Sequence, residues 1–249
     1  MNRFAPFLDR PIAHRALHDL GCGRPENSRA AIAAACQAGY GIEIDVQPSA
    51  DGHAMVFHDY DLGRLTDAKG AIGVRSATDL ARLTLNGGAD GIPTLPEVLQ
   101  IIEGRVPLVI EIKDQDGAMG SNVGALEKAV LAAIADYAGP FAIMSFNPHS
   151  IGVLRASGAS CPLGLVTCDF AAADWPTLPE ARRAELAKMD LTAQSVEFIS
   201  HGWRDLHSPR VAAAKAKGIS VICWTVRSAE EEKTALKVAD AVTFEGYLA

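Results

Sequence analysis

Two acidic residues, Glu43 and Asp45, stand two positions apart in a β-branched run that is typical of a buried strand. Side chains two apart on a strand point to the same face, so both carboxylates would need a cation beside them. After the turn Asp51-Gly52, a second apolar run ends at His58. Carboxylates that hold a hard divalent ion beside an imidazole could support hydrolysis. The same pattern also fits a strand at a solvated sheet edge, with His58 as a surface residue.

The composition restricts the class of protein. The 249 residues are 49% hydrophobic and 21% charged, which is enough for the core of one α/β barrel or of two smaller domains. The net charge is −7 and the basic residues are scattered, so we expect no nucleic-acid binding. No run reaches the ~18 apolar residues of a membrane span, and the N-terminus lacks a signal-peptide core. We therefore expect a cytoplasmic protein. Five cysteines without a C-x-x-C pair argue against a disulfide framework and a zinc knuckle.

Strand and helix patterns alternate along most of the chain. The eight expected strands are 10–14, the run around Glu43 and Asp45, 107–113, 141–145, 163–167, 195–199, 219–225 and 241–244. The expected helices are 28–38, 93–102, 122–137, 148–156, 178–188, 208–217 and 229–236. This order predicts an α/β fold, a (β/α)8 TIM barrel with parallel strands. A doubly wound open sheet is the alternative, but no G-x-G-x-x-G follows the first strand.

Residues 60–92 interrupt this alternation with polar, glycine-punctuated sequence and one modest helix pattern near 78–85. We expect the segment to be too poor in apolar residues to hold a core of its own. We therefore interpret it as a small insertion on the barrel rim after the second strand. Residues 1–249 are then predicted to form a single domain.

Polar side chains gather at or near the C-terminal ends of the expected strands. They are His14, Arg15, Glu43, Asp45, Glu111, Lys113, Ser145, Trp224 and Thr225. Each one alone has an ordinary structural explanation, such as a hydrogen-bonded core histidine, a rim ion pair or a packed tryptophan. Their coincidence at the end of a barrel where active sites are built favours a functional site.

The residue types favour a phosphodiester as substrate. Glu43, Asp45 and Glu111 offer hard oxygen ligands for Mg²⁺ or Ca²⁺. Arg15 and Lys113 could hold the non-bridging phosphate oxygens. Two imidazoles, His14 and His58, could divide the proton transfers between the nucleophile and the leaving oxygen. Neither a G-x-S-x-G elbow nor a P-loop is present, so acyl transfer and nucleotide hydrolysis lose their usual signatures.

As an ordered set, these residues resemble the glycerophosphodiester phosphodiesterase family. The matching motifs are His14-Arg15, Pro25-Glu26-Asn27-Ser28, Glu43-Ile44-Asp45-Val46, His58-Asp59, Leu62-x-Arg64-x-Thr66, Ile92-Pro93-Thr94-Leu95, Glu97-Val98-Leu99, Glu111-Ile112-Lys113, Ser145-Phe146 and Trp224-Thr225-Val226. Each motif alone is weak, but together they span nearly the whole chain in the order of the family.

The resemblance implies a barrel with an insertion after the second strand and a divalent ion on Glu43, Asp45 and Glu111. It also implies substrate contacts from Arg15, Lys113 and Trp224, with His14 and His58 as the acid–base pair. By analogy with the family, the glycerol hydroxyl of the substrate attacks phosphorus and water opens the resulting cyclic phosphate. The products would be sn-glycerol 3-phosphate and an alcohol.

The chain departs from the family pattern at two places. Ala16 replaces a usual glycine, within a long spacing between the His-Arg and Pro-Glu-Asn motifs, and residues 243–247 replace Thr-Asp-x-Pro. We interpret His18, Cys22 and His53 as polar bystanders. The alternatives are a larger lysophospholipid or sugar phosphodiester as substrate, or a non-catalytic barrel that binds phosphorylated ligands. The sequence selects neither the alcohol, the ion nor the oligomeric state.

Overall fold

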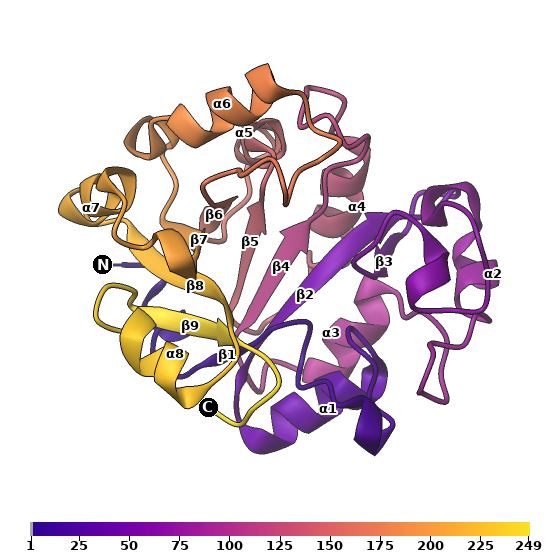
Figure 1. Ribbon diagram of the computed structural model, residues 1–249. Helices are drawn as coiled ribbons and strands as arrows, with labels where there is room; N and C mark the ends of the chain where they lie inside the picture. Colours follow the sequence, from indigo (N-terminus) through magenta and orange to yellow (C-terminus); the bar gives the residue numbers. More distant parts are fainter. Residues whose placement is uncertain (1) are drawn as a thin grey trace.

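Eight parallel strands close into a barrel in the computed structural model, which describes residues 2–249 (Figure 1). The barrel strands are β1 (Ile12–Ala13), β2 (Gly41–Pro48), β4 (Leu108–Ile112), β5 (Phe141–Ser145), β6 (Leu163–Thr167), β7 (Phe198–Gly202), β8 (Ser220–Val226) and β9 (Ala241–Phe244). The short β1 closes the ring because it pairs in parallel with both β2 and β9. The predicted (β/α)8 TIM barrel is confirmed, and the open sheet is excluded.

Helices surround the barrel and begin where the sequence supplies caps. They are α1 (Arg29–Ala38), α3 (Leu95–Ile102), α4 (Ala125–Ala133), α5 (Pro148–Ala156), α6 (Glu180–Lys188), α7 (Pro209–Ala216) and α8 (Ala229–Ala235). Ser28 caps α1 by accepting a hydrogen bond from the backbone of Ala31, and Thr94 forms a capping box with Glu97 at α3. None of the helices among residues 2–249 has the length and apolar character needed to cross a membrane.

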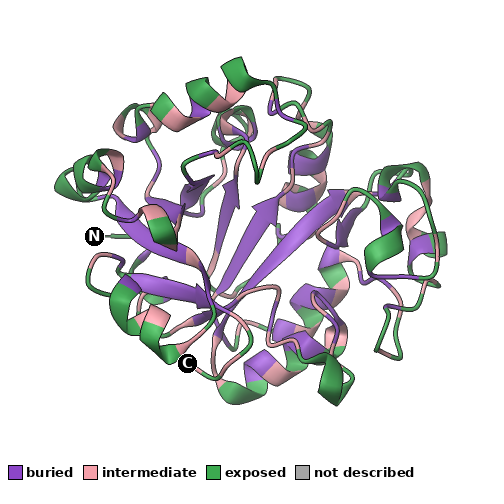
Figure 2. Cartoon of the chain, viewed as in Figure 1, coloured by how far each residue is buried: buried purple, intermediate pink, exposed green. Residues whose placement is uncertain are grey.

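The inside of the barrel is layered because alternate residues of each strand point inward. The lower layers are apolar, and Figure 2 shows the strands as the buried centre of the molecule. Phe4 and Phe7, at the short 3-10 helix η1 (Ala5–Phe7), pack into this cluster, and the Phe4 ring stacks on Phe198 of β7 with 3.9 Å between centroids. Two positions beyond the apolar layer of β4, at Val109, stands Glu111. The same alternation that packs the core therefore delivers polar groups to the C-terminal mouth.

Three expected elements have different bounds. The strand expected at 195–199 is β7, Phe198–Gly202, because Ser195 is left-handed (φ 52°) after the 3-10 helix η5 (Leu191–Gln194) and ladder pairing with β6 starts at Phe198. The helix expected at 122–137 is α4, which begins only after Gly124. The helix pattern near 78–85 is the single turn α2 (Ala77–Leu80).

The segment 60–92 lies beside the barrel, next to the antiparallel strand β3 (Ala54–Val56) (Figure 1). It contains the 3-10 helices η3 (Leu62–Arg64) and η4 (Ile72–Val74) together with α2. The segment was expected to be too poor in apolar residues to hold a core of its own, and its buried residues share a core with residues outside it. Its apolar residues are widely spaced, but they gather with Met55 and Phe57 in one buried cluster: Leu62, Leu65, Ile72, Leu80, Leu85 and Ile92. Because Met55 belongs to β3 and Phe57 follows it, the cluster anchors the segment to the end of β2.

Candidate active site

A cavity of about 350 Å³ opens at the C-terminal ends of the barrel strands. All eight site residues proposed from the sequence line it: His14, Arg15, Glu43, Asp45, His58, Glu111, Lys113 and Trp224. They come from five separate stretches of the chain, and barrel closure brings them together. Ser145 is different, because its hydroxyl is buried and donates to the carbonyl of Ile112, which gives it a structural role. Thr225 also lines the cavity.

The three carboxylates stand close enough to bind one ion. Glu43, Asp45 and Glu111 each offer an oxygen, and these atoms lie within 4.8 Å of one another. Asp45 of β2 is the register partner of Glu111 on β4, and all three side chains are buried. Burial raises the pKa of Glu43 well above its usual range, and the charges of Asp45 and Glu111 raise it further. A divalent cation fits this donor set, because it would neutralise buried like charges on hard oxygen ligands.

Two basic side chains lie against the carboxylates. Lys113 Nζ lies 2.8 Å from Glu111 Oε1 and 3.1 Å from Asp45 Oδ1. Burial raises the pKa of Asp45, but Lys113 in particular holds it well below its usual range. Arg15 Nε lies 3.7 Å from Asp45 Oδ2, while its backbone N–H donates to Glu43 Oε2 over 2.9 Å. The positive charges of Arg15 and Lys113 therefore lie beside the carboxylate cluster within the same cavity.

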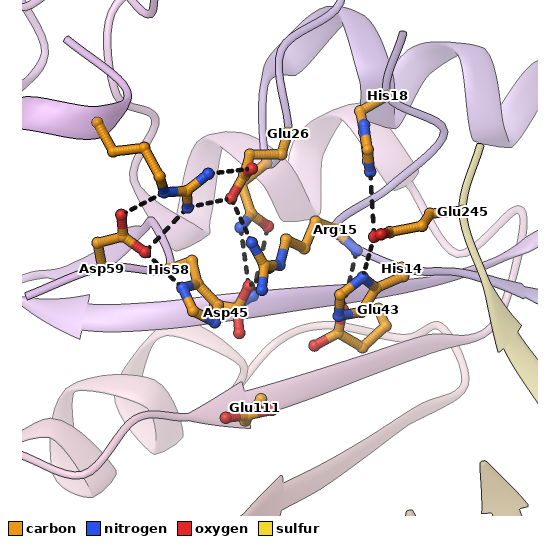
Figure 3. Close-up of polar contacts among 12 residues, drawn as sticks. His14, Arg15, His18, Glu26, Glu43, Asp45, His58, Asp59, Glu111 and Glu245 are labelled. Carbon is orange, nitrogen blue, oxygen red and sulfur yellow. Dashed lines mark hydrogen bonds and ion pairs between the residues drawn. The ribbon is translucent and has the colours of Figure 1, made fainter. Parts of the chain in front are cut away.

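His58 is held by a chain of charged groups (Figure 3). Its Nδ1 lies 2.6 Å from Asp59 Oδ1, and Arg64 donates from Nε to the other oxygen of Asp59 over 2.6 Å. Arg64 also donates to both oxygens of Glu26, which in turn accepts from Arg15 over 2.8 Å. The motif residues Asp59, Glu26 and Arg64 thus link one imidazole to the guanidinium of Arg15.

His14 contacts a residue that the sequence did not single out. Its Nδ1 lies 2.6 Å from Oε2 of Glu245, which directly follows β9 (Figure 3). The same oxygen lies 3.6 Å from His18 Nε2, and Arg227 pairs with the other oxygen over 2.7 Å. His18, which we interpreted as a bystander, lines the cavity together with Glu245. Cys22 and His53 are exposed and lie outside its lining. The only sequence signal for Glu245 was the departure at residues 243–247.

Comparison with known proteins fits this geometry. The model of the glycerophosphoryl diester phosphodiesterase family matches residues 14–243. The chain belongs to this family. A glycerophosphodiester phosphodiesterase of Caldanaerobacter subterraneus subsp. tengcongensis is 29% identical over 57% of this chain and 61% of its own length. One of Bacillus altitudinis is 36% identical over 43% of this chain and 45% of its own length. The matches thus span about half to three fifths of these two relatives.

Solved structures agree over nearly the whole chain. A phosphodiesterase of Oleispira antarctica, solved in complex with the product sn-glycerol-3-phosphate, is 25% identical with a TM-score of 0.76, over 98% of this chain and 95% of that chain.

The present chain departs from the pattern of the glycerophosphoryl diester phosphodiesterase family at Ala16, whose backbone is left-handed, at φ 66°. Glycine adopts that conformation without strain and alanine does not, so the turn is kept despite the substitution.

Aromatic side chains form one wall of the cavity in the present chain. Trp224 of β8 donates from its indole N–H to the carbonyl of Ser200 over 3.0 Å, and its ring meets Phe146 edge-on at 5.5 Å between centroids. Phe146 also packs on Trp175, in the long connection between β6 and α6. The cavity thus has an acidic side on β2 and β4 and an aromatic side that includes Trp224 on β8.

Proposed function

We propose that this chain is a metal-dependent hydrolase of glycerophosphodiesters, which yields sn-glycerol 3-phosphate and an alcohol. The observation that carries the proposal is one cavity in which two imidazoles, three clustered carboxylates and two basic side chains converge. A non-catalytic binding site has no need of two histidines beside the carboxylates. Membership of the family and the product complex of the Oleispira antarctica relative support the same reaction.

The cofactor in this proposal is a divalent ion, Mg²⁺ or Ca²⁺, held by Glu43, Asp45 and Glu111. Their carboxylate oxygens suit both ions. When bound, such an ion acts as a Lewis acid that neutralises charge on the phosphate oxygens. Lys113 and Arg15 would bind the remaining phosphate charge, Arg15 with its planar guanidinium and Lys113 as a point charge. Trp224 would contact the substrate from the aromatic wall.

The two histidines would move the protons of both steps. In the first step, one imidazole takes the proton of the glycerol hydroxyl as that oxygen bonds to phosphorus. The bond from phosphorus to the leaving oxygen breaks, and the other imidazole, in its protonated form, gives that oxygen a proton. In the second step, the roles reverse, because water attacks the cyclic phosphate and the ring oxygen leaves with a proton. That both imidazoles line one cavity supports this division of the proton transfers.

The decisive experiment is the release of sn-glycerol 3-phosphate from glycerophosphocholine, glycerophosphoethanolamine and glycerophosphoglycerol, with Mg²⁺ or Ca²⁺ and with EDTA. We expect turnover that EDTA abolishes and that His14→Ala or His58→Ala reduces by a factor of about 100 or more. His53→Ala is the matched control, because His53 is exposed and outside the cavity. Tight binding of these diesters without turnover would instead identify a phospho-ligand-binding barrel.

A larger alcohol portion is a second candidate, because the cavity has a neighbour. A second cavity of about 420 Å³ shares Trp224, Thr225 and Arg227 with the first. The added space would accommodate a lysophospholipid or a sugar phosphodiester. A kcat/KM for lysophosphatidylcholine above that for glycerophosphocholine would favour this candidate.

The division of the chain into domains is also part of the proposal. We propose one catalytic domain over residues 1–249, with residues 60–92 as an insertion on its rim. Its buried cluster includes Met55 and Phe57 from the end of the β2–β3 hairpin, so the insertion has no core separate from that hairpin. The cytoplasmic location stays a prediction from the sequence.

A further inference from the structure

Glu245 connects the two places where this chain departs from its family. It lies in the altered C-terminal segment, and its backbone N–H donates to the carbonyl of Val226 at the end of β8 over 3.0 Å. From there its carboxylate reaches His14 at the end of β1 and His18 in the long loop that follows. Arg227 pairs with the carboxylate from the opposite side. The side chain is therefore fixed by the backbone and by contacts from three segments.

This arrangement determines which nitrogen of His14 carries a proton. Burial raises the pKa of Glu245, but the hydrogen bond from His14 and the proximity of His18 and Arg227 outweigh it and leave the pKa well below its usual range. An ionised carboxylate can only accept, so His14 Nδ1 must donate across the 2.6 Å contact. In the neutral ring, Nε2 is then the basic nitrogen. It makes no hydrogen bond to the rest of residues 2–249, and His14 lines the cavity.

The second imidazole of the cavity is held in the same way. His58 Nδ1 contacts Asp59, and Asp59 pairs with Arg64, just as His14 contacts Glu245 and Glu245 pairs with Arg227. Both contacts consist of an imidazole, a carboxylate and an arginine, but the distance along the sequence between histidine and carboxylate differs. Asp59 directly follows His58, whereas Glu245 lies 231 residues after His14. A carboxylate on each Nδ1 is what a pair of histidines needs if both are to exchange protons through Nε2.

We propose that Glu245 is a positioning residue for His14, which holds its ring in the Nδ1–H tautomer so that Nε2 exchanges the proton with the substrate. This inference rests on the function proposed above. The other charged groups that act on His14 are Arg15 and Asp45, and His18 and Glu43 line the same cavity. None of them has a hydrogen bond to His14 within residues 2–249, so Glu245 alone sets the tautomer.

The test variant is Glu245→Gln, which keeps the size of the side chain and removes its charge. A glutamine can turn its NH₂ toward Nδ1 and so favour the opposite tautomer. We expect kcat for glycerophosphocholine to fall about 10- to 100-fold while KM changes less than about threefold. Glu231→Gln is the matched control, because Glu231 accepts from the backbone of Arg227 over 2.7 Å but lies outside the cavity. It should retain the wild-type kcat.

A spectroscopic measurement on the metal-free protein tests the contact between His14 and Glu245 without any catalytic turnover. Two-bond ¹H–¹⁵N spectra at about pH 8, where a histidine is neutral, separate the two tautomers by the shifts of the ring nitrogens. The His14 signals are assigned by their loss in His14→Gln. We expect the Nδ1–H pattern in the wild type and in Glu231→Gln, and loss of that pattern in Glu245→Gln.

Two results would overturn the inference. One is an Nε2–H tautomer at His14 in the wild type, and the other is an unchanged or increased kcat in Glu245→Gln. A wild-type protein that releases no glycerol 3-phosphate would instead contradict the proposed function, and the tautomer would still report whether Glu245 orients the ring. The failure of one proposal is therefore distinguishable from the failure of the other.

Discussion

Asn27 donates from its side-chain amide to Asp45 Oδ2 over 2.9 Å, and its own backbone is left-handed, at φ 57°. The amide thus holds one carboxylate of the proposed metal site in place, from the start of α1. Glycine adopts the left-handed conformation readily, so Asn27→Gly removes the amide without backbone strain. We expect the affinity for Mg²⁺ to fall about tenfold or more, because partners that orient a metal ligand typically contribute that much. Isothermal titration calorimetry of the metal-free protein measures it.

The control for this prediction is Asn86→Ala, since Asn86 is exposed and far from the carboxylates in the sequence. Its Mg²⁺ affinity should equal that of the wild type. An Asn27→Gly variant with unchanged affinity would show that Asp45 needs no orienting partner.

Replacing Glu43 should raise the stability of the metal-free protein and reduce the stabilisation that Mg²⁺ provides. In EDTA, Glu43→Gln removes a carboxyl group whose ionised form burial and the neighbouring Asp45 and Glu111 disfavour, so we expect the melting temperature to rise. With Mg²⁺ at a hundredfold excess over Kd, the wild type should gain about 2.7 kcal/mol of unfolding free energy, whereas the variant should gain clearly less. Thermal melts in both buffers test this, with the exposed Glu103→Gln as control. Equal metal-induced gains in Glu43→Gln and the wild type would remove Glu43 from the ligand set.

The sequence predicted the parts of the fold and the site that rest on local periodicity. Strand alternation brought Glu43 and Asp45 to one face, and the cap at Ser28 placed the start of α1. The contact between His14 and Glu245 could not be predicted, because it depends on β1 pairing with β9 at the closure of the barrel. Likewise β7 continues through Ser200 and His201, polar residues that an apolar pattern excludes from a buried strand. These features depend on pairing between strands that are distant in the sequence, and local sequence patterns carry no information about that pairing.

The burial of His201 should make the free energy of unfolding depend on pH. Its side chain is fully buried, with Nδ1 2.7 Å from Thr167 Oγ1 and Nε2 3.1 Å from Asp205. Burial lowers its pKa, and the hydrogen bond that Nε2 makes to the carboxylate of Asp205 offsets only part of this. The unfolded chain therefore takes up the proton first, so acidification through about pH 6.5 reduces the unfolding free energy. One such group contributes at most about 1.4 kcal/mol per pH unit.

Urea unfolding of the wild type and His201→Gln between about pH 7.5 and pH 5.5 isolates this contribution. Glutamine cannot take up the proton, so the variant should lose less stability on acidification than the wild type does. The comparison of slopes holds even where the variant is less stable at both pH values. Parallel pH dependences would mean that His201 has the same pKa in the folded and unfolded states.

Replacing Phe4 should reduce the stability of the fold without altering the cavity. Its ring is fully buried and lies in stacked contact with Phe7 and Phe198, at 4.6 and 3.9 Å between centroids. Because Phe198 belongs to the barrel strand β7, it cannot move to fill the space that Phe4→Ala would leave. We expect a loss of about 3–5 kcal/mol in unfolding free energy, the usual cost of removing a buried aromatic ring.

Urea unfolding measures this loss, and Leu20→Ala is the control, since Leu20 is 65% exposed and should change stability by less than about 0.5 kcal/mol. At a temperature where Phe4→Ala is still folded, its KM for glycerophosphocholine should match that of the wild type, because Phe4 belongs to the apolar barrel cluster and does not line the cavity. A small loss of stability would mean that residues near the N-terminus detach from the barrel at little cost. A raised KM with little loss of stability would mean that packing at Phe198 is transmitted through β7 to the carboxyl ends of the strands.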